Sequence, residues 1–221
     1  MSSKQVKSKK RVADHGEVFT SEREVNAMLD LVRQETERIE SRFLEPACGT
    51  GNFLAEILRR KLEVVSGRYR NSQKEWELYS IIAVSSIYGI EILIDNVTEC
   101  RERLLGIYTN TYYRHFGNNS NKACVRAAEF ILERNILSGD ALNLKTPDDT
   151  HRPIIFSEWS AVKDGMIKRR DFTMANLLES QPMEEENLFS DLGDRAFLPT
   201  PVAEFPLQHF TKIGADDGDK L

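Results

Sequence analysis

The sequence predicts an α/β fold built on a partial parallel sheet. Three short apolar runs, at residues 43–44, 87–92 and 135–142, are typical of buried strands, and each lies beside a glycine or an acidic residue. Apolar residues recur at helical spacing between these runs. A fourth run from residue 153 leads through a Lys-Asp-Gly turn into a charged segment ending at residue 172, which predicts a C-terminal β-hairpin.

The composition is that of a globular chain without a membrane span. The chain has 221 residues, 40% of them hydrophobic, so it can form one domain with a sizeable core. No run approaches the roughly 18 apolar residues of a membrane helix, and the charged N-terminus differs from a signal sequence. We therefore expect a cytoplasmic protein. Cys48, Cys100 and Cys124 have neither disulfide nor zinc-ligand spacing, which predicts free thiols and no metal site.

Charge is unevenly distributed along the chain, although the net charge is only -5. Residues 1–15 form a basic arm, which can contact nucleic-acid phosphates or remain a solvated terminus. Residues 173–221 form an acidic, proline-containing extension, which we expect to dock on the body of this chain or on another chain. The first eleven residues contain five bases and no acid: Lys4, Lys7, Lys9, Lys10 and Arg11.

The stretch from Phe43 to Leu54 predicts a ligand-binding turn. A short strand leads into the turn, and a helix is expected to start at Asn52. Gly49 and Gly51 lack a Cβ, so the backbone can take positive φ and a ligand can approach closely. The helix directs its free N–H groups into the same space. A fixed negative charge on Glu45 suits a cationic or amine-bearing ligand and argues against a nucleoside triphosphate.

The nine residues of this turn resemble a known signature. Glu-Pro-Ala-Cys-Gly-Thr-Gly-Asn-Phe is similar to the S-adenosylmethionine (SAM) signature of amino-methylating DNA methyltransferases, especially adenine-N6 enzymes and the modification subunits of restriction systems. The resemblance implies a Rossmann-like SAM-dependent methyltransferase fold. It also implies that nine residues bind the cofactor: Glu45, Pro46, Ala47, Cys48, Gly49, Thr50, Gly51, Asn52 and Phe53.

A segment upstream of the turn fits the same family. Ser21 and Glu24 form a capping box, and a helix with Val25, Met28, Leu29, Val32 and Ile39 on one face is expected to follow. The Gly-Glu-Val-Phe-Thr sequence of residues 16–20 resembles a segment whose Thr holds the cofactor's methionine carboxylate. Phe19 and Thr20 match that segment, while Ser21 replaces its usual proline.

The second and third strands end in carboxylates. Ser72 and Glu75 predict the start of an inserted helix before the second strand. A carboxylate at the end of that strand, Glu91, can accept hydrogen bonds from ribose hydroxyls. The resemblance implies that Glu91 holds the SAM ribose and that Ile92 packs on the adenine. It also implies that Asp140, with Ala141 beside it, accepts from the adenine amine.

Two further helices are expected between these strands. Asp95 or Asn96 is predicted to cap the first of them. Its inward face should carry Val97, Cys100, Leu104, Leu105 and Tyr108. An alanine-rich helix then ends near Arg134.

The family's catalytic tetrapeptide, with its Pro-Pro pair, is absent because the sequence has seven prolines and no such pair. Ser157 to Ser160 occupy the corresponding place, where Glu158 could accept from an amine and Trp159 could stack on a flipped base. Alternatively, the strand continues to a turn at residues 163–165 and returns as residues 166–172.

The returning strand carries Lys168, Arg169 and Arg170. These three bases predict either contact with a nucleic-acid backbone or an edge strand protected by charge.

The sequence thus predicts that residues 16–172 form a SAM-binding, methyltransferase-like domain. The first hypothesis is a DNA adenine-N6 methyltransferase, or its SAM-binding subunit, with DNA and a second subunit as partners. The catalytic groups would be Glu158 and Trp159 or belong to another chain. The alternative is a non-catalytic SAM-binding scaffold or regulatory subunit of a restriction or phage-defence complex. A third hypothesis is methyl transfer to a small molecule, RNA or protein.

Overall fold

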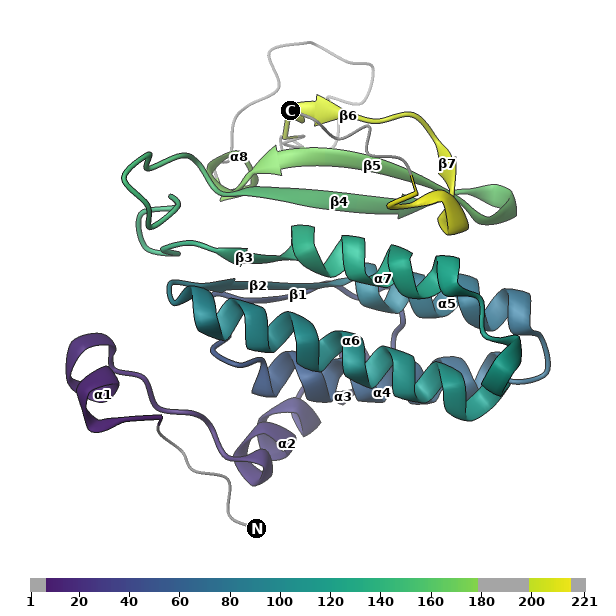
Figure 1. Ribbon diagram of the computed structural model, residues 1–221, viewed down its shortest axis with the longest axis horizontal. Coiled ribbons are helices and arrows are strands. Elements are labelled where there is room, and N and C mark those ends of the chain that lie inside the picture. The colour runs from purple at the N-terminus through teal and green to yellow at the C-terminus, as the bar shows by residue number, and fades with distance from the viewer. Residues whose placement is uncertain (1–6, 179–198, 216–221) are drawn as a thin grey trace, which may run out of the picture.

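Helices and two small sheets form the protein, whose structure is a computed structural model that describes residues 7–178 and 199–215 (Figure 1). The helices are α1 Lys9–His15, α2 Glu22–Asp30, α3 Arg33–Thr36, α4 Asn52–Tyr69, α5 Gln73–Ser85, α6 Ile94–Phe116, α7 Lys122–Asn135 and α8 Met174–Leu178. The strands are β1 Phe43–Glu45, β2 Ile87–Glu91, β3 Ile136–Ser138, β4 Ile155–Ala161, β5 Met166–Thr173, β6 Ala203–Glu204 and β7 Gln208–His209. Short 3₁₀ turns cover Gly117–Asn119, Lys163–Gly165 and Phe210–Lys212. Among the described residues, no helix is both long enough and apolar enough to cross a membrane.

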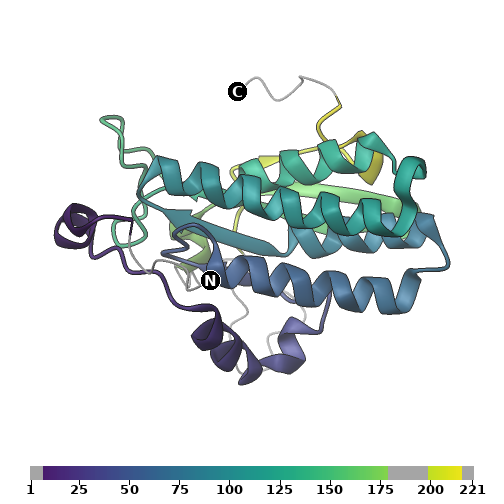
Figure 2. The same ribbon diagram turned by 60° about the horizontal axis from the view of Figure 1, so that its bottom comes forward.

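The first sheet is parallel, with strand order β1-β2-β3. Phe43 pairs with Ile87, and Gly89 pairs with Ile136, so the carboxyl ends of the strands lie together. Helices α4 and α6 pack against one face of this sheet, whereas α5 and α7 run directly into β2 and β3 and extend the lines of those strands (Figure 2). The prediction of an α/β fold with three parallel strands is therefore confirmed.

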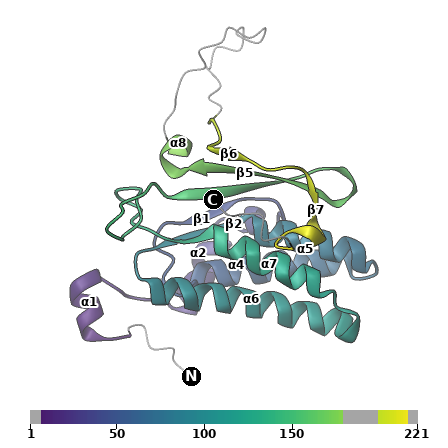
Figure 3. The ribbon, with the colours of Figure 1, turned by 45° about the horizontal axis from the view of Figure 1, so that its top comes forward.

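The second sheet is antiparallel and covers the opposite face of the first. Strands β4 and β5 form the predicted hairpin, which extends over both the parallel sheet and the ends of α5 and α7 (Figure 3). Near the parallel sheet, the Tyr88 hydroxyl donates to the Ser157 carbonyl at 3.2 Å, and the Tyr88 and Phe156 rings meet edge to face. The hairpin therefore closes the core from above.

Strands β6 and β7 both pair with β5, so β5 lies inside its sheet. The prediction that β5 is a charge-protected edge strand is therefore wrong. Residues 199–215 of the extension dock on the body of the chain, and Phe210 and Ile213 are buried in the main core. The acidic run at residues 184–186 lies outside the described residues.

Asn135 joins the two sheets at the end of α7. Its side chain is completely buried, and its amide donates to the carbonyls of Ser85 and Ile87 at 3.2 and 3.0 Å. Its Oδ1 accepts from the Trp159 indole N–H at 3.0 Å. One amide thus links α5, β2 and the hairpin.

Lys61 holds the chain that leads into β1. Its side chain is fully buried in α4, and its ammonium donates to the carbonyls of Ile39 and Ser41 and to the Ser86 hydroxyl. Burial lowers the pKa of Lys61 to about 7. The three acceptors fix the approach to the strand that carries the glycine turn.

Several helix boundaries agree with the predictions and others do not. The capping box of Ser21 and Glu24 is present, and Ser72 caps α5. Two short helices, α2 and α3, replace the predicted single helix, because the chain turns at residues 31–32. Val32 lies in that turn and is exposed, and Met28 lies on the exposed face of α2, so neither is buried as predicted.

Neither Asp95 nor Asn96 caps α6, so that prediction is wrong. The helix begins at Ile94, after Leu93, which makes no side-chain capping bond. Asp95 and Asn96 instead lie in its first turn, where both bind residues of the N-terminal segment.

Candidate functional site

A cavity of 540 Å³ lies at the carboxyl ends of the three parallel strands. The turn after β1, the end of β2, the loop after β3 and an N-terminal segment each form one wall. The lining residues are Gly16, Glu17, Val18, Phe19, Thr20, Glu45, Pro46, Ala47, Cys48, Gly49, Asn52, Phe53, Glu91, Ile92, Leu93, Gly139, Asp140, Ala141 and Leu142. Every residue predicted to bind the cofactor lines this cavity, except Thr50 and Gly51.

The glycine turn has the backbone conformation expected of it. Gly49 and Gly51 have φ angles of 52° and 82°, in the left-handed region that favours glycine. A Cβ on Gly51 would lie 2.5 Å from the Cys100 sulfur, and one on Gly49 would lie 3.2 Å from the Phe19 ring. Gly51 therefore serves packing, whereas Gly49 faces the cavity. Helix α4 begins directly after the turn, at Asn52.

Glu91 braces the turn as well as facing the cavity. Its two carboxylate oxygens accept from the backbone N–H groups of Gly49 and Leu93, both at 2.9 Å. The residue is only 8% exposed. Each carboxylate oxygen can accept a second hydrogen bond, so a ligand hydroxyl can still bind.

Two more carboxylates complete the polar wall. Burial raises the pKa of Glu45, because the charged form loses hydration there. Asp140 accepts from the Leu142 N–H and from the Asn143 side chain, both at 2.8 Å. These bonds hold the loop after β3 in a tight turn that leaves Leu142 97% exposed at the cavity.

The N-terminal segment contributes a residue that the sequence analysis did not single out. Glu17 lines the cavity, and its Oε1 accepts from Asn96 at 2.7 Å and from Arg11 at 2.8 Å. Its Oε2 is buried and accepts no hydrogen bond from the described residues. Glu17 lies two residues before Phe19, in the segment already predicted to contact the cofactor, and this position could have indicated that it lines the cavity. The Thr20 carbonyl accepts from Asn52, which fixes this segment to the start of α4.

The charges that line the cavity all have one sign. Glu17, Glu45, Glu91 and Asp140 line it, and among the described residues no lysine, arginine or histidine does. Because four carboxylates would repel a phosphate and no basic side chain among the described residues of the wall would offset them, this wall disfavours a phosphorylated ligand. It favours a cation that also carries several hydrogen-bond donors.

A second cavity, of 460 Å³, lies behind the turn and between the N-terminal segment, α2 and α6. Phe19 and Asn52 line both cavities, while Thr50 lines only the second. Arg103 donates to the Thr50 carbonyl and to Asn52 Oδ1, so the turn is also supported from this side.

The structure does not bring the two catalytic candidates to the cavity. Glu158 and Trp159 lie within β4, which confirms the strand interpretation of this segment. Glu158 binds Arg42 and Arg170. Burial opposes its ionisation, but hydrogen bonds from Arg42 and Ser160 outweigh that effect and lower the pKa of Glu158. Trp159 is buried and bonded to Asn135.

The three bases of β5 point to different faces and form ion pairs. Arg169 is 5% exposed, and its guanidinium binds the Asp171 carboxylate at 2.8 and 2.9 Å. Lys168 pairs with Glu204, and Arg170 pairs with Glu158. A single basic surface for nucleic acid, as the sequence suggested, is therefore not formed by these residues.

The basic arm is partly engaged as well. Lys7 and Arg11 bind acidic residues of α6, while Lys9 and Lys10 are exposed on α1. Lys4 lies outside the described residues.

No group of three or more metal-ligating side chains is arranged around a common centre in the described ranges 7–178 and 199–215. Comparison of the chain with protein-family models, with curated proteins and with solved structures gives no match. The properties of the cavity therefore carry the functional argument.

Proposed function

We propose that the chain binds SAM in the cavity at the carboxyl ends of β1, β2 and β3. The observation that carries this proposal is the convergence of four carboxylates and a glycine turn on one cavity whose described lining contains no basic residue. SAM is cationic at sulfur and carries an ammonium group, two ribose hydroxyls and an adenine amine. These groups match a wall of carboxylates better than a dinucleotide or a nucleoside triphosphate would.

Each acidic residue has a proposed partner on the ligand. Glu45 would face the ammonium group, Glu91 the ribose hydroxyls and Asp140 the adenine amine. Ile92 and Ala141 would supply apolar contacts to the adenine. The parallel order β1-β2-β3 with helices on one face is the arrangement on which we base the proposal of a Rossmann-like methyltransferase fold.

We propose further that the chain is the SAM-binding subunit of an adenine-N6 DNA methyltransferase. When bound, SAM supplies an electrophilic methyl group for an exocyclic amine. The described residues around the cavity hold no counterpart of the family's catalytic tetrapeptide, and Glu158 and Trp159 are engaged inside the hairpin. A second subunit would then supply the groups that hold the target base. Strand β1 is an edge of its sheet and Leu44 is 46% exposed, so this side of the described structure is accessible to a partner.

The same engagement of Glu158 and Trp159 favours a second candidate function. In that case the chain is a non-catalytic SAM-binding subunit of a restriction or defence complex. Transfer of a radiolabelled methyl group from SAM to DNA separates the two: activity of the chain with its partner subunit supports the first, and SAM binding without transfer supports the second.

Calorimetric titration of the whole chain with SAM tests the binding proposal. We expect one site, and weaker binding of S-adenosylhomocysteine because it lacks the sulfonium charge. ATP should not bind. Gly49→Val should abolish binding, because the added side chain would occupy the turn beside Phe19.

Glu91→Gln should weaken SAM binding by about 1 to 3 kcal/mol, since hydrogen bonds to a charged group are lost. Glu63→Gln is the matched control, because Glu63 is exposed on α4 and does not line the cavity. Absence of heat with SAM, or equal affinity for SAM and ATP, would contradict the proposal.

The pH dependence of binding gives a further check. Because burial raises the pKa of Glu45, this carboxylate becomes neutral at a higher pH than an ordinary glutamate. Affinity for SAM should therefore fall on acidification at a pH above the ordinary glutamate range, and Glu45→Gln should remove that part of the profile. A profile unchanged by Glu45→Gln would show that Glu45 does not face the cation.

A further inference from the structure

The N-terminal segment, residues 7–20, forms one wall of the cavity. Residues 16–20 of this segment line the cavity of 540 Å³. On the other side of Phe19 lies the second cavity, of 460 Å³. Residues around Phe19 therefore have a cavity on each side, and a segment that is supported in this way can open at low free-energy cost.

Hydrogen bonds and ion pairs attach the segment to α6. None of residues 9–14 in α1 is buried, and α1 stands away from the helical layer (Figure 1). By contrast, the next helix, α2, buries Val25 and Leu29 against the body. Ion pairs therefore attach residues 7–20 to the body, whereas buried apolar side chains attach α2.

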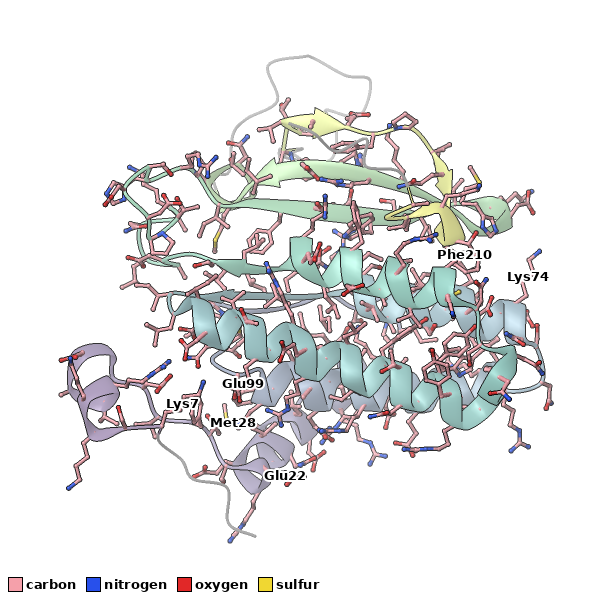
Figure 4. All side chains as sticks on the ribbon, in the orientation of Figure 1. Lys7, Glu22, Met28, Lys74, Glu99 and Phe210 are labelled. Atoms are coloured by element: carbon pink, nitrogen blue, oxygen red, sulfur yellow. The ribbon has the colours of Figure 1, made fainter. Side chains whose placement is uncertain are left out.

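The attachment is an ionic latch formed with the first turns of α6. Lys7 binds Glu99 at 2.6 Å and Arg11 binds Asp95 at 2.5 Å, and Figure 4 shows Lys7 and Glu99 facing each other between the segment and α6. Asp95 and Glu99 side chains are each 53% exposed, so salt reaches and screens both pairs.

The latch also reaches the cavity wall. Arg11 binds Glu17 as well as Asp95, and Asn96 binds both Glu17 and Lys7. Two buried atoms of this network, Arg11 Nε and Glu17 Oε2, have no hydrogen-bond partner among the described residues. Unsatisfied buried polar atoms favour rearrangement. Movement of the latch would therefore move the Glu17 carboxylate relative to the ligand.

We propose that residues 7–20 form a gate that opens by breaking the ionic latch and closes over the bound ligand. This inference rests on the proposed function for the ligand itself, but the latch can be tested without it. Closure brings the negative charge of Glu17 to the cavity, so ligand binding and latch formation stabilise each other. The segment remains anchored at Thr20, whose carbonyl is bonded to Asn52, and at the Ser21 capping box.

Hydrogen–deuterium exchange of the whole chain, followed by mass spectrometry, tests the gate. Without ligand, residues 8–20 should exchange faster than α4, and raising the salt concentration should accelerate only the segment. Saturating SAM should slow exchange in residues 8–20 at least about tenfold, because exchange follows the population of the open state.

The latch variant is Asp95→Asn combined with Glu99→Gln. It should accelerate exchange in residues 8–20 without ligand and raise the Kd for SAM by roughly three- to tenfold, since the closed state is less populated. Glu102→Gln is the matched control, because Glu102 is exposed on the same helix and forms no ion pair in the described structure. The control should behave as wild type.

Glu17→Gln tests the link between the gate and the ligand. It should reduce affinity for SAM more than affinity for S-adenosylhomocysteine, which a merely structural role of Glu17 would not do. The gate is overturned if SAM binds and residues 8–20 exchange at an unchanged rate. If SAM gives no heat of binding, the proposed function fails. The latch is then judged alone, and equal exchange in wild type and the latch variant at low salt would overturn it.

Discussion

The two sheets of this protein differ in whether their charged side chains form ion pairs. In the antiparallel sheet, Arg169 is paired with Asp171 and Arg170 with Glu158, so charge is neutralised within the sheet. At the parallel sheet, Glu45 and Glu91 form no ion pair in the described part of the chain, and Glu91 accepts only from backbone N–H groups. The comparison teaches that carboxylates without an ion pair beside a cavity, rather than the amount of buried charge, set the parallel sheet apart and support the proposed ligand site there.

Arg169→Met should give the largest loss of unfolding free energy, and it changes a residue of the antiparallel sheet alone. The variant leaves the Asp171 carboxylate buried, and among the described side chains only the Ser157 hydroxyl would still donate a hydrogen bond to it. Removing one partner of a buried pair costs about 3 to 5 kcal/mol of unfolding free energy. Urea unfolding should show this loss, while the Kd for SAM should stay unchanged in the folded variant. A large change in Kd would break the separation of the two halves.

Lys61→Met should give an intermediate effect in the parallel half. The variant leaves the carbonyls of Ile39 and Ser41 without the ammonium donor. Loss of hydrogen bonds to a charged group costs about 1.5 to 3 kcal/mol. Because this site supports the approach to β1, SAM affinity should fall together with stability, unlike in Arg169→Met. Equal affinity in wild type and variant would mean that the approach to β1 does not position the turn.

The same lysine predicts a pH dependence of stability. Its pKa is about 7 in the folded chain and 10.5 when unperturbed, so between these values the unfolded chain binds a proton that the folded chain lacks. Stability should therefore rise with pH across this window. Thermal unfolding of wild type and Lys61→Met from pH 7 to 10 checks this, and the variant should lack that contribution to the slope. Parallel profiles for the two proteins would contradict the assignment.

Gly106→Ala should give the smallest effect. Gly106 lies inside α6, where an added Cβ would meet no atom of the described residues within 4 Å. Alanine should stabilise the helix by about 0.5 to 1 kcal/mol, because it restricts the unfolded chain. If this part of α6 serves only as a scaffold, the melting temperature should rise and the Kd for SAM, measured by titration, should stay unchanged. An altered affinity would show that α6 is coupled to the cavity at this point.

Local signals in the sequence predicted much of the parallel half. The capping residues Ser21 and Ser72 act over three residues, so a single sequence suffices to place them. The glycine turn and the carboxylates Glu91 and Asp140 follow from strand ends that a short apolar run identifies. Signals of this range depend on neighbouring residues alone.

Contacts between distant segments were not predictable in the same way. The two-residue strands β6 and β7 carry no periodic pattern, so their pairing with β5 was missed. Arg11 and Asp95 are 84 positions apart, and no local motif indicates that they meet. The end of α2 was missed because neither glycine nor proline marks it.

The buried amide of Asn135 has a consequence for how the molecule unfolds. Its three hydrogen bonds tie α5 and β2 to the hairpin, so neither sheet can separate without leaving a buried polar group unpaired. The parallel and antiparallel sheets should therefore unfold together in one cooperative transition, with equal calorimetric and van't Hoff enthalpies.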